Sequence, residues 1–309
     1  MKRLISIWVK FRLEEWIAFL FLIPTWIITL RANWYFWALE EKIPRKFYGG
    51  IWRLVITMLV MGLYYTFLKK KWGWRYLWWL REVMPFVFCV TIYTNLHDTI
   101  HFVNPHDIHH YLVAIDQWMF GIQPCVWAQQ FYHPWLTDYF SISYMNYFLI
   151  SVIVVLWLMV RKRHEEMRMA LLGTILCFYF GYFLYILFPA APPRLVLADQ
   201  FIRDFSGSWL TITQSKIVNI NPSSSRAAFP SLHCAITLIS LLYAFRFERL
   251  LFWLLLIPGI SLALATVYLR HHYVIDILAG FALAGIVFWI TPKIDRIWRA
   301  FQSQIRSAA

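Results

Sequence analysis

The two residues best suited to chemistry are His272 and Asp276, in the stretch "YLRHHYVIDILAG" (268–280). Residues four apart share one face of a helix, so the Asp276 carboxylate can hydrogen-bond one nitrogen of the His272 ring. Such a bond fixes the tautomer and makes the other nitrogen a better base or nucleophile. His271 is expected to point elsewhere. A plainer interpretation also fits: two interfacial histidines reach lipid headgroups, and Asp276 sits near the positive end of a helix dipole.

A third histidine, His233, follows Pro-Ser at the start of another apolar run, "AAFPSLHCAITLIS" (227–240). Pro and Ser favour the first turn of a helix, so Ser231 is expected beside free backbone N–H groups. A helix start binds anions and suits phosphate, and His233 would give a proton to an oxygen that leaves the bound anion. An interfacial histidine behind an ordinary helix cap explains the same residues without chemistry.

Arg194 lies in the proline-rich stretch "LFPAAPPRLV" (187–196). Its planar guanidinium matches the oxygens of a phosphate group, although an arginine at a helix end is often only an interfacial anchor. Each of the three stretches is a weak signal alone. Together, on one face of a membrane, they indicate a phosphate-handling site.

Two other clusters suggest different chemistry. The stretch "NLHDTIHFVNPHDIHHY" (95–111) is rich in histidine, and His97 and His101 have the spacing of a metal-binding pair. Metal and haem sites need more ordered ligand spacing than this stretch offers. Cys234 adjoins His233, but helix neighbours point about 100° apart, so we expect Cys234 to pack against another helix. We therefore predict no metal and no cofactor.

The composition places these stretches in a membrane protein. Of the 309 residues, 61% are hydrophobic, 20% are aromatic and only 15% are charged, which is too little charge to cover a soluble domain of this size. The net charge of +13 comes from short basic clusters between apolar runs. That distribution is typical of loops facing anionic lipid, and it argues against a nucleic-acid partner. The four scattered cysteines predict neither a disulfide framework nor a zinc site.

The apolar runs predict an all-α, polytopic membrane protein with about eight spans. The candidate spans are 16–33, 49–68, 77–96, 138–160, 169–188, 231–246, 250–268 and 273–291.

The basic residues also predict the orientation of the chain. With a cytoplasmic N-terminus, 18 Lys and Arg residues fall in cytoplasmic segments and nine outside, and the other two lie within spans. This ratio favours that orientation. The polar stretches 97–136 and 189–230 and the histidine loop then share the outer face. The pattern suits a bacterial inner membrane, with the site facing the periplasm or exterior.

The motifs "PAAPPR", "FPSLH" and "HYVID" resemble, in order and spacing, those of the type-2 phosphatidic acid phosphatase superfamily. The closest likeness is to its inositol phosphorylceramide synthase branch, which "AIDQWMFGIQP" (114–124) also resembles. The resemblance covers about 80–291. It implies a six-helix catalytic core, 77–292, with a two-span N-terminal extension, 1–76, and a cytoplasmic tail, 293–309.

The resemblance also implies a role for each motif residue. His272 would be the nucleophile of a metal-independent reaction through a covalent phosphohistidine, and Asp276 would orient it. His233 would be the acid for the leaving group. Arg194 and the helix start near Ser231 would hold the phosphate.

Two positions depart from the family pattern. Leu187 stands where the first motif usually has a lysine, and Ala265-Thr266 stand where the third motif usually has Ser-Arg. Either Arg270 or Arg226 is expected to supply the lost positive charge.

The sequence leaves the reaction class open. The substrate would be a lipid phosphate or phospholipid in the bilayer. Water attack on the intermediate would make the protein a lipid phosphate phosphatase, whereas an alcohol acceptor would make it a head-group phosphotransferase. The alternative from another class is a non-catalytic lipid-binding or transport protein with a proton-linked histidine site, although transporters usually show internal repeats and charged residues at mid-membrane depth.

Overall fold

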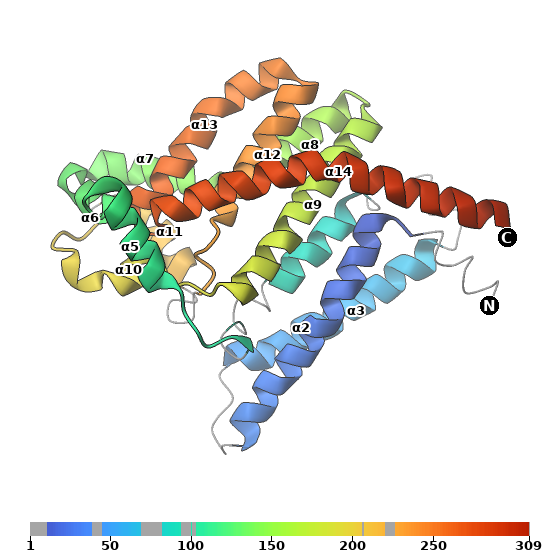
Figure 1. Cartoon of the computed structure of the whole chain (residues 1–309), viewed down its shortest axis with the longest axis horizontal. Coiled ribbons are helices and arrows are strands. Elements are labelled where there is room, and N and C mark those ends of the chain that lie inside the picture. The colour runs from blue at the N-terminus through green and yellow to red at the C-terminus, as the bar shows by residue number, and fades with distance from the viewer. Residues whose placement is uncertain are drawn as a thin grey trace. The chain divides into compact units, whose positions relative to one another are not determined.

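The computed structural model describes residues 11–38, 45–68, 82–93, 100, 103–205, 207–219 and 226–308 (Figure 1). Helices account for most of these residues, and the described part of the chain contains no β-strand, only one parallel bridge between Ala190 and Ala227. The prediction of an all-α membrane protein is confirmed.

The chain forms two compact units. Unit 1 contains Met1–Val103 and Trp289–Ala309, and unit 2 contains Asn104–Phe288. The division into a two-span extension, a six-helix core and a tail stays a prediction, because contacts within a unit do not test a functional boundary.

Unit 1 includes α2 (Leu13–Ala38), α3 (Arg45–Leu68) and the short apolar helix Glu82–Tyr93. An ion pair ties the start of α2 to that short helix, with Arg12 Nη1 2.6 Å from Glu82 Oε2. The pair is largely shielded from solvent, with Glu82 13% exposed, so it fixes this end of the unit more firmly than a surface pair would.

The helical core of unit 2 is built around α12. It consists of α7 (Pro134–Met145), α8 (Tyr147–Val160), α9 (His164–Leu187), α12 (Leu232–Phe247) and α13 (Arg249–Tyr268). The helix α12 packs against α8, α9 and α13 (Figure 1). Most of its side chains are buried, and a helix that is apolar on all sides is expected in such a central position.

Short elements gather in the segments between the core helices of unit 2. They are α5 (His109–Phe120), α6 (Pro124–Trp127), η1 (Ala128–Phe131), α10 (Pro193–Val196), η2 (Ala198–Gln200) and α11 (Trp209–Asn219). These elements fall in the polar stretches 97–136 and 189–230, which the sequence assigns to one face.

The last helix, α14 (Val274–Ala308), begins in unit 2 directly after the histidine loop. Gly280 lets it approach the start of α12 closely, because a Cβ at this position would lie 2.5 Å from the Ser231 carbonyl oxygen. The absence of a side chain at Gly280 therefore sets how near the second and third motifs come to each other.

Four described helical segments are long and apolar enough to cross a membrane: Leu13–Tyr35, His164–Leu187, Arg249–Tyr268 and Val274–Ile305. A fifth span arises if α7 and α8, bent by 49° at a short break, are taken together. The three other predicted spans coincide with the shorter apolar helical stretches Leu54–Leu63, Glu82–Tyr93 and Leu232–Phe247. The count of eight spans stays a prediction.

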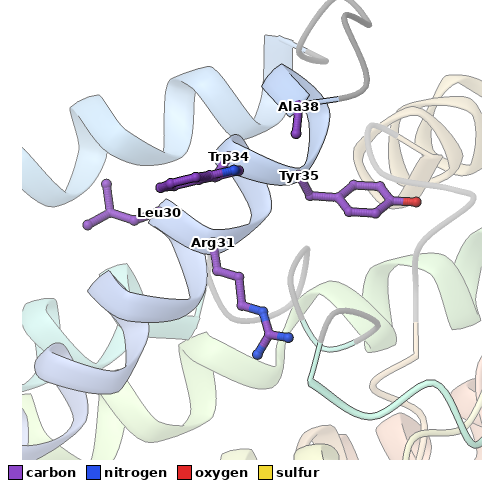
Figure 2. Close-up of a pocket in the computed structure, with 5 residues that line it drawn as sticks. All are labelled: Leu30, Arg31, Trp34, Tyr35 and Ala38. Atoms are coloured by element: carbon purple, nitrogen blue, oxygen red, sulfur yellow. The ribbon is translucent and has the colours of Figure 1, made fainter.

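A surface pocket of about 440 Å³ lies along α2 in unit 1 (Figure 2). It is lined by residues of that single helix: Leu30, Arg31, Trp34, Tyr35 and Ala38. The motif residues play no part in it. The pocket therefore does not mark the site of the chemistry expected from the sequence.

Candidate active site

The second motif forms the start of α12. Ser231 is the N-cap, and its Oγ accepts a hydrogen bond from the Cys234 backbone N–H at 3.4 Å. Serine suits this position because its side chain satisfies one of the N–H groups that the first turn leaves free. His233 lies in that first turn, so its ring projects at the same end of the helix as the remaining N–H groups.

The third motif follows a tight ending of α13. Arg270 N–H bonds to the Val267 carbonyl at 3.0 Å, and His271 N–H bonds to the Thr266 carbonyl at 2.8 Å. This pattern places the residue after the helix in the left-handed conformation, which usually falls to glycine. Here it is Arg270, with φ of 61°, at a cost on the order of 1 kcal/mol. The turn carries both following histidines into the protein, where His272 is only 3% exposed.

His272 links the two motifs through both of its ring nitrogens. Its Nδ1 lies 3.3 Å from Asp276 Oδ2, and its Nε2 lies 3.3 Å from Nδ1 of His233. Asp276 is fully buried, and the same carboxylate oxygen accepts the Tyr273 backbone N–H at 3.0 Å. Because the carboxylate accepts from Nδ1–H, the free lone pair of His272 is on Nε2.

Arg194 of the first motif contacts the other histidine of the loop. Its Nη1 donates to His271 Nδ1 at 2.9 Å, and Gln214 Nε2 of α11 lies 3.0 Å from His271 Nε2. An arginine has only donors, so His271 accepts here and is uncharged. His271 thus holds the guanidinium beside the pair formed by His233 and His272.

Backbone hydrogen bonds join the three motifs directly. Ala190 N–H bonds to the Arg226 carbonyl at 3.0 Å, and Ala228 N–H returns to the Ala190 carbonyl at 3.1 Å. Further along, Arg194 N–H bonds to the Arg270 carbonyl at 3.0 Å, and Ser231 N–H bonds to the Asp276 carbonyl at 2.9 Å. The first, second and third motifs therefore meet in one place, far apart as they are in sequence.

The two arginines expected to replace the missing motif arginine have other partners. Arg270 Nε donates to the Tyr132 hydroxyl at 2.8 Å, its Nη2 bonds to the Arg203 carbonyl, and its guanidinium carbon lies 4.0 Å from the Phe201 ring centroid. Arg226 forms an ion pair with Asp107 at 2.9 Å. A role for either arginine at the phosphate stays a prediction.

Cys234 is buried, with its Sγ 4.0 Å from Thr266 Oγ1 of α13. It packs against a neighbouring helix, as expected from its direction on α12.

The two histidines of the loop are neutral at pH 7. Burial lowers the pKa of His272 to about 3, and the charge of Arg194 acts in the same direction. Burial also lowers the pKa of His271 well below its ordinary value. Burial lowers the pKa of Arg194 too, yet a guanidinium stays protonated in proteins. The site therefore combines one fixed cation with uncharged imidazoles.

Sequence reasoning missed two tyrosines that touch His233. The ring of Tyr144, in the last turn of α7, stacks on the His233 ring with centroids 4.6 Å apart, and it also contacts His271 at 4.4 Å. Tyr147, the first residue of α8, contacts His233 at 4.5 Å. Aromatic residues are frequent throughout this chain, so composition and spacing give no signal that distinguishes these two.

Asp116 makes a contact that positions α14. The sequence pointed to this residue only through the resemblance of residues 114–124 to the inositol phosphorylceramide synthase branch. Its carboxylate accepts the backbone N–H groups of Val274 at 2.8 Å and Ile275 at 3.0 Å, which are the first two of α14. It is 1% exposed. A helix start without a capping residue of its own is thus capped from α5, and this contact fixes the helix that carries Asp276.

The histidine-rich stretch does not add to this site. Its pair His97 and His101 lies outside the described residues. In the part of the chain that the structure describes, no group of three or more His, Cys, Asp or Glu side chains is arranged to hold a metal ion.

The family of the chain follows from comparison with known proteins. No curated protein and no solved structure gives a significant match. A family model described as the PAP2 superfamily matches residues 110–290, which is more than half of the chain and contains all three motifs. The chain belongs to the PAP2 superfamily, and this membership indicates a phosphatase or phosphotransferase that acts on lipid phosphates in a membrane.

Proposed function

We propose that the protein transfers the phosphoryl-type group of a membrane lipid through a covalent phosphohistidine at the non-cytoplasmic surface. The observation that carries this proposal is the chain of contacts from Asp276 to His272 to His233, at 3.3 Å each. It has the order of an orienting carboxylate, a nucleophile and a proton donor.

In the first step, Nε2 of His272 attacks phosphorus while Asp276 keeps the proton on Nδ1. The bond between phosphorus and the ester oxygen breaks, and His233 gives a proton to that oxygen. Negative charge spreads over the phosphoryl oxygens as the bond breaks. Arg194 and the N–H groups at the start of α12, capped by Ser231, supply the compensating positive field.

The substrate must enter between the two imidazoles. In the resting structure, the attacking nitrogen of His272 faces His233 directly. In-line transfer requires the nucleophile and the proton donor on opposite sides of phosphorus, so phosphate binding parts the rings. His233 then moves from covering the nucleophile to meeting the leaving oxygen.

The second step decides the reaction class. Water would release phosphate and make the protein a lipid phosphate phosphatase. An alcohol acceptor would make it a head-group phosphotransferase, and the likeness of the motifs and of residues 114–124 to the inositol phosphorylceramide synthase branch favours this outcome.

The non-catalytic alternative fits the site less well. A proton-linked transporter needs groups that change charge near neutral pH. Burial lowers the pKa of His272 to about 3, so this ring does not titrate in that range.

Product analysis tests the proposal. The purified protein in detergent is incubated with a panel of lipid phosphates and phospholipids, with and without added alcohols such as inositol, glycerol and a sphingolipid. Free phosphate without an acceptor identifies a phosphatase, and a new phospholipid formed only with an alcohol identifies a transferase. Binding without turnover of any lipid would support the transport alternative. Turnover should persist in excess EDTA. A loss of turnover that zinc or magnesium restores would instead support a metal site at His97 and His101.

The nucleophile is tested by His272→Asn. We expect turnover to fall by about a thousandfold or more, because nothing else can carry the covalent intermediate. Acid-labile label from a radioactive lipid phosphate should appear on the wild type and not on this variant.

His164→Asn is the matched control. His164 begins α9, about 35 Å along the helix from the end that leads into the first motif, and its loss should leave turnover unchanged. Full activity in His272→Asn would exclude the proposed nucleophile.

A further inference from the structure

Two tyrosines enclose His233 from the bent segment that joins α7 and α8. The Tyr144 ring lies at 29° to the His233 ring with centroids 4.6 Å apart, and the Tyr147 ring lies at 54° with centroids 4.5 Å apart. Both distances are in the range of favourable aromatic contact. The break in the helix falls between them, at Asn146, so the two rings reach the same imidazole from the end of one helix and the start of the next.

The charged and titratable groups around His233 provide little support for a positive ring. His272 faces it from the α13–α14 loop, and the fixed charge of Arg194 faces it from α10 and repels a cation. On its own helix its neighbours are Ser231 and Cys234. Asp276, the carboxylate of the motif, bonds to His272 and not to His233.

This arrangement conflicts with the role of His233 in the proposed reaction. A proton donor must carry an extra proton before the ester bond breaks, so His233 has to exist as an imidazolium inside a largely buried site. The face of a tyrosine ring attracts a cation within about 6 Å of its centroid. Tyr144 and Tyr147 are the groups in contact with His233 that can supply this attraction.

We propose that Tyr144 and Tyr147 form an aromatic clamp that stabilises protonated His233 and positions it as the proton donor to the leaving oxygen. The proposal rests on the proposed function and deepens it. As the bond from His272 Nε2 to phosphorus forms, the ester bond breaks and a proton on His233 passes to the departing alkoxide. His233 is then neutral, and in the second step it takes a proton from the attacking water or alcohol.

The clamp should therefore matter most for esters whose leaving group needs a proton. An alkoxide is a poor leaving group and depends on general acid catalysis, whereas a nitrophenolate leaves without a proton. Substrate preference by leaving-group basicity is the property that the two tyrosines would confer.

The test compares two esters with the same alkyl chain: dodecyl phosphate and a dodecyl-substituted nitrophenyl phosphate. Alcohol or nitrophenol released in the first turnover is measured for Tyr144→Leu and Tyr147→Leu, which remove a ring, and for Tyr144→Phe and Tyr147→Phe, which keep it. Tyr139→Leu is the matched control, because Tyr139 is on the same helix and its hydroxyl contacts Ser261 of α13 at 2.5 Å.

Each leucine variant should lose about 5- to 30-fold in rate on dodecyl phosphate and less than about twofold on the nitrophenyl ester. The phenylalanine variants and Tyr139→Leu should stay within about twofold of the wild type on both esters. Undiminished rates on the nitrophenyl ester also show that the leucine variants are folded.

Equal losses on both esters would assign the tyrosines a purely structural role and overturn the inference, as would undiminished rates on dodecyl phosphate. In either case the proposed function stands if His272→Asn is inactive. If His272→Asn remains active on either ester, the proposed function is wrong, and the inference about the clamp is wrong with it.

Discussion

Two half-buried arginines at opposite ends of the helical core of unit 2, Arg163 and Arg194, have different kinds of hydrogen-bond partner. At the end where α8 meets α9, Arg163 donates to the Phe247 carbonyl at 2.6 Å, to Glu248 at 2.9 Å and to Glu166 at 3.1 Å. At the motif end, the Arg194 guanidinium donates to the neutral His271 at 2.9 Å. One arginine is paired with two carboxylates, and the other lies against an uncharged ring.

This difference in partners indicates a different role for each arginine. A cation paired with carboxylates is already compensated and holds loops together. A half-buried cation that donates to a neutral ring keeps part of its desolvation cost, and the cost falls when an anion binds. We infer that the motif end is built to be completed by a ligand, and that the opposite end is complete as it stands.

The comparison is tested most strongly by replacing the two arginines in turn. Arg194→Ala should slow the first chemical step by about 100- to 1000-fold, because one fixed donor to the developing charge is lost. Arg194→Lys should restore part of the rate, since the charge returns without the planar fork. The measurement is single-turnover release of the lipid alcohol.

Arg163→Ala is the matched control, and it should lower thermal stability while leaving turnover unchanged. Equal losses of rate in Arg194→Ala and Arg163→Ala would show that the two arginines do not differ in their role in turnover. Full turnover in Arg194→Ala would remove this arginine from the phosphate site.

The second test concerns the close approach of helices at the motif end. In Gly280→Ala the new Cβ would lie 2.5 Å from the Ser231 carbonyl oxygen, so α14 and α12 must move apart and His272 with Asp276 must shift relative to His233. We expect roughly a tenfold loss of turnover, because small misplacements of catalytic groups are expensive.

Gly285→Ala on the same helix is the control. A Cβ there meets nothing within 4 Å, and alanine favours helix by about 0.5–1 kcal/mol over glycine. This variant should keep its activity and gain stability. Wild-type turnover in Gly280→Ala would show that the spacing of the motifs tolerates change.

The smallest expected effect is in the pH dependence of stability. Burial lowers the pKa of His272 to about 3 in the folded state, whereas an unfolded chain has a histidine pKa of about 6.5. As the pH falls below about 6.5, the unfolded state binds the proton first and stability is lost, by up to about 1.4 kcal/mol per pH unit for this ring. Above that pH the ring is neutral in both states and contributes no slope.

Thermal unfolding midpoints in detergent between pH 7.5 and 5 measure this effect. The decline should be shallower in His272→Asn and unchanged in Arg163→Ala, because the charge change in this range belongs to histidine. An identical decline in wild type and His272→Asn would mean that folding does not lower the pKa of His272.

The sequence predicted the local contacts of this site better than the long-range contacts that support them. His272 and Asp276 were expected to share one helix face. His272 instead lies in the loop before α14, and the short spacing still brings its ring to the Asp276 carboxylate in the first turn of that helix. The start of α12 at Ser231 follows from capping preferences in the same way. The contacts of Asp116 with α14, of Arg194 with His271 and of Tyr144 with His233 join segments that are 77 or more residues apart, and no local pattern encodes such pairings.

The helices show the same contrast between features that one segment determines and features that no local pattern encodes. Long apolar runs such as 169–188 and 250–268 predicted α9 and α13, since hydrophobic length is a property of one segment. The run 138–160 was predicted as one helix, yet it is bent by 49° between α7 and α8. Nothing in its composition marks Asn146 as a break, and this break lies between Tyr144 and Tyr147, which both contact His233.

The hydrogen bonds that join Ala190 to Arg226, Arg194 to Arg270, and Ser231 to Asp276 bear on how the protein is made. A ribosome delivers these segments in order, and the third motif emerges only after the first two. Before that moment a nascent chain in the translocation machinery carries disconnected fragments and no reactive centre. The proposed site therefore assembles only after the third motif has been synthesised.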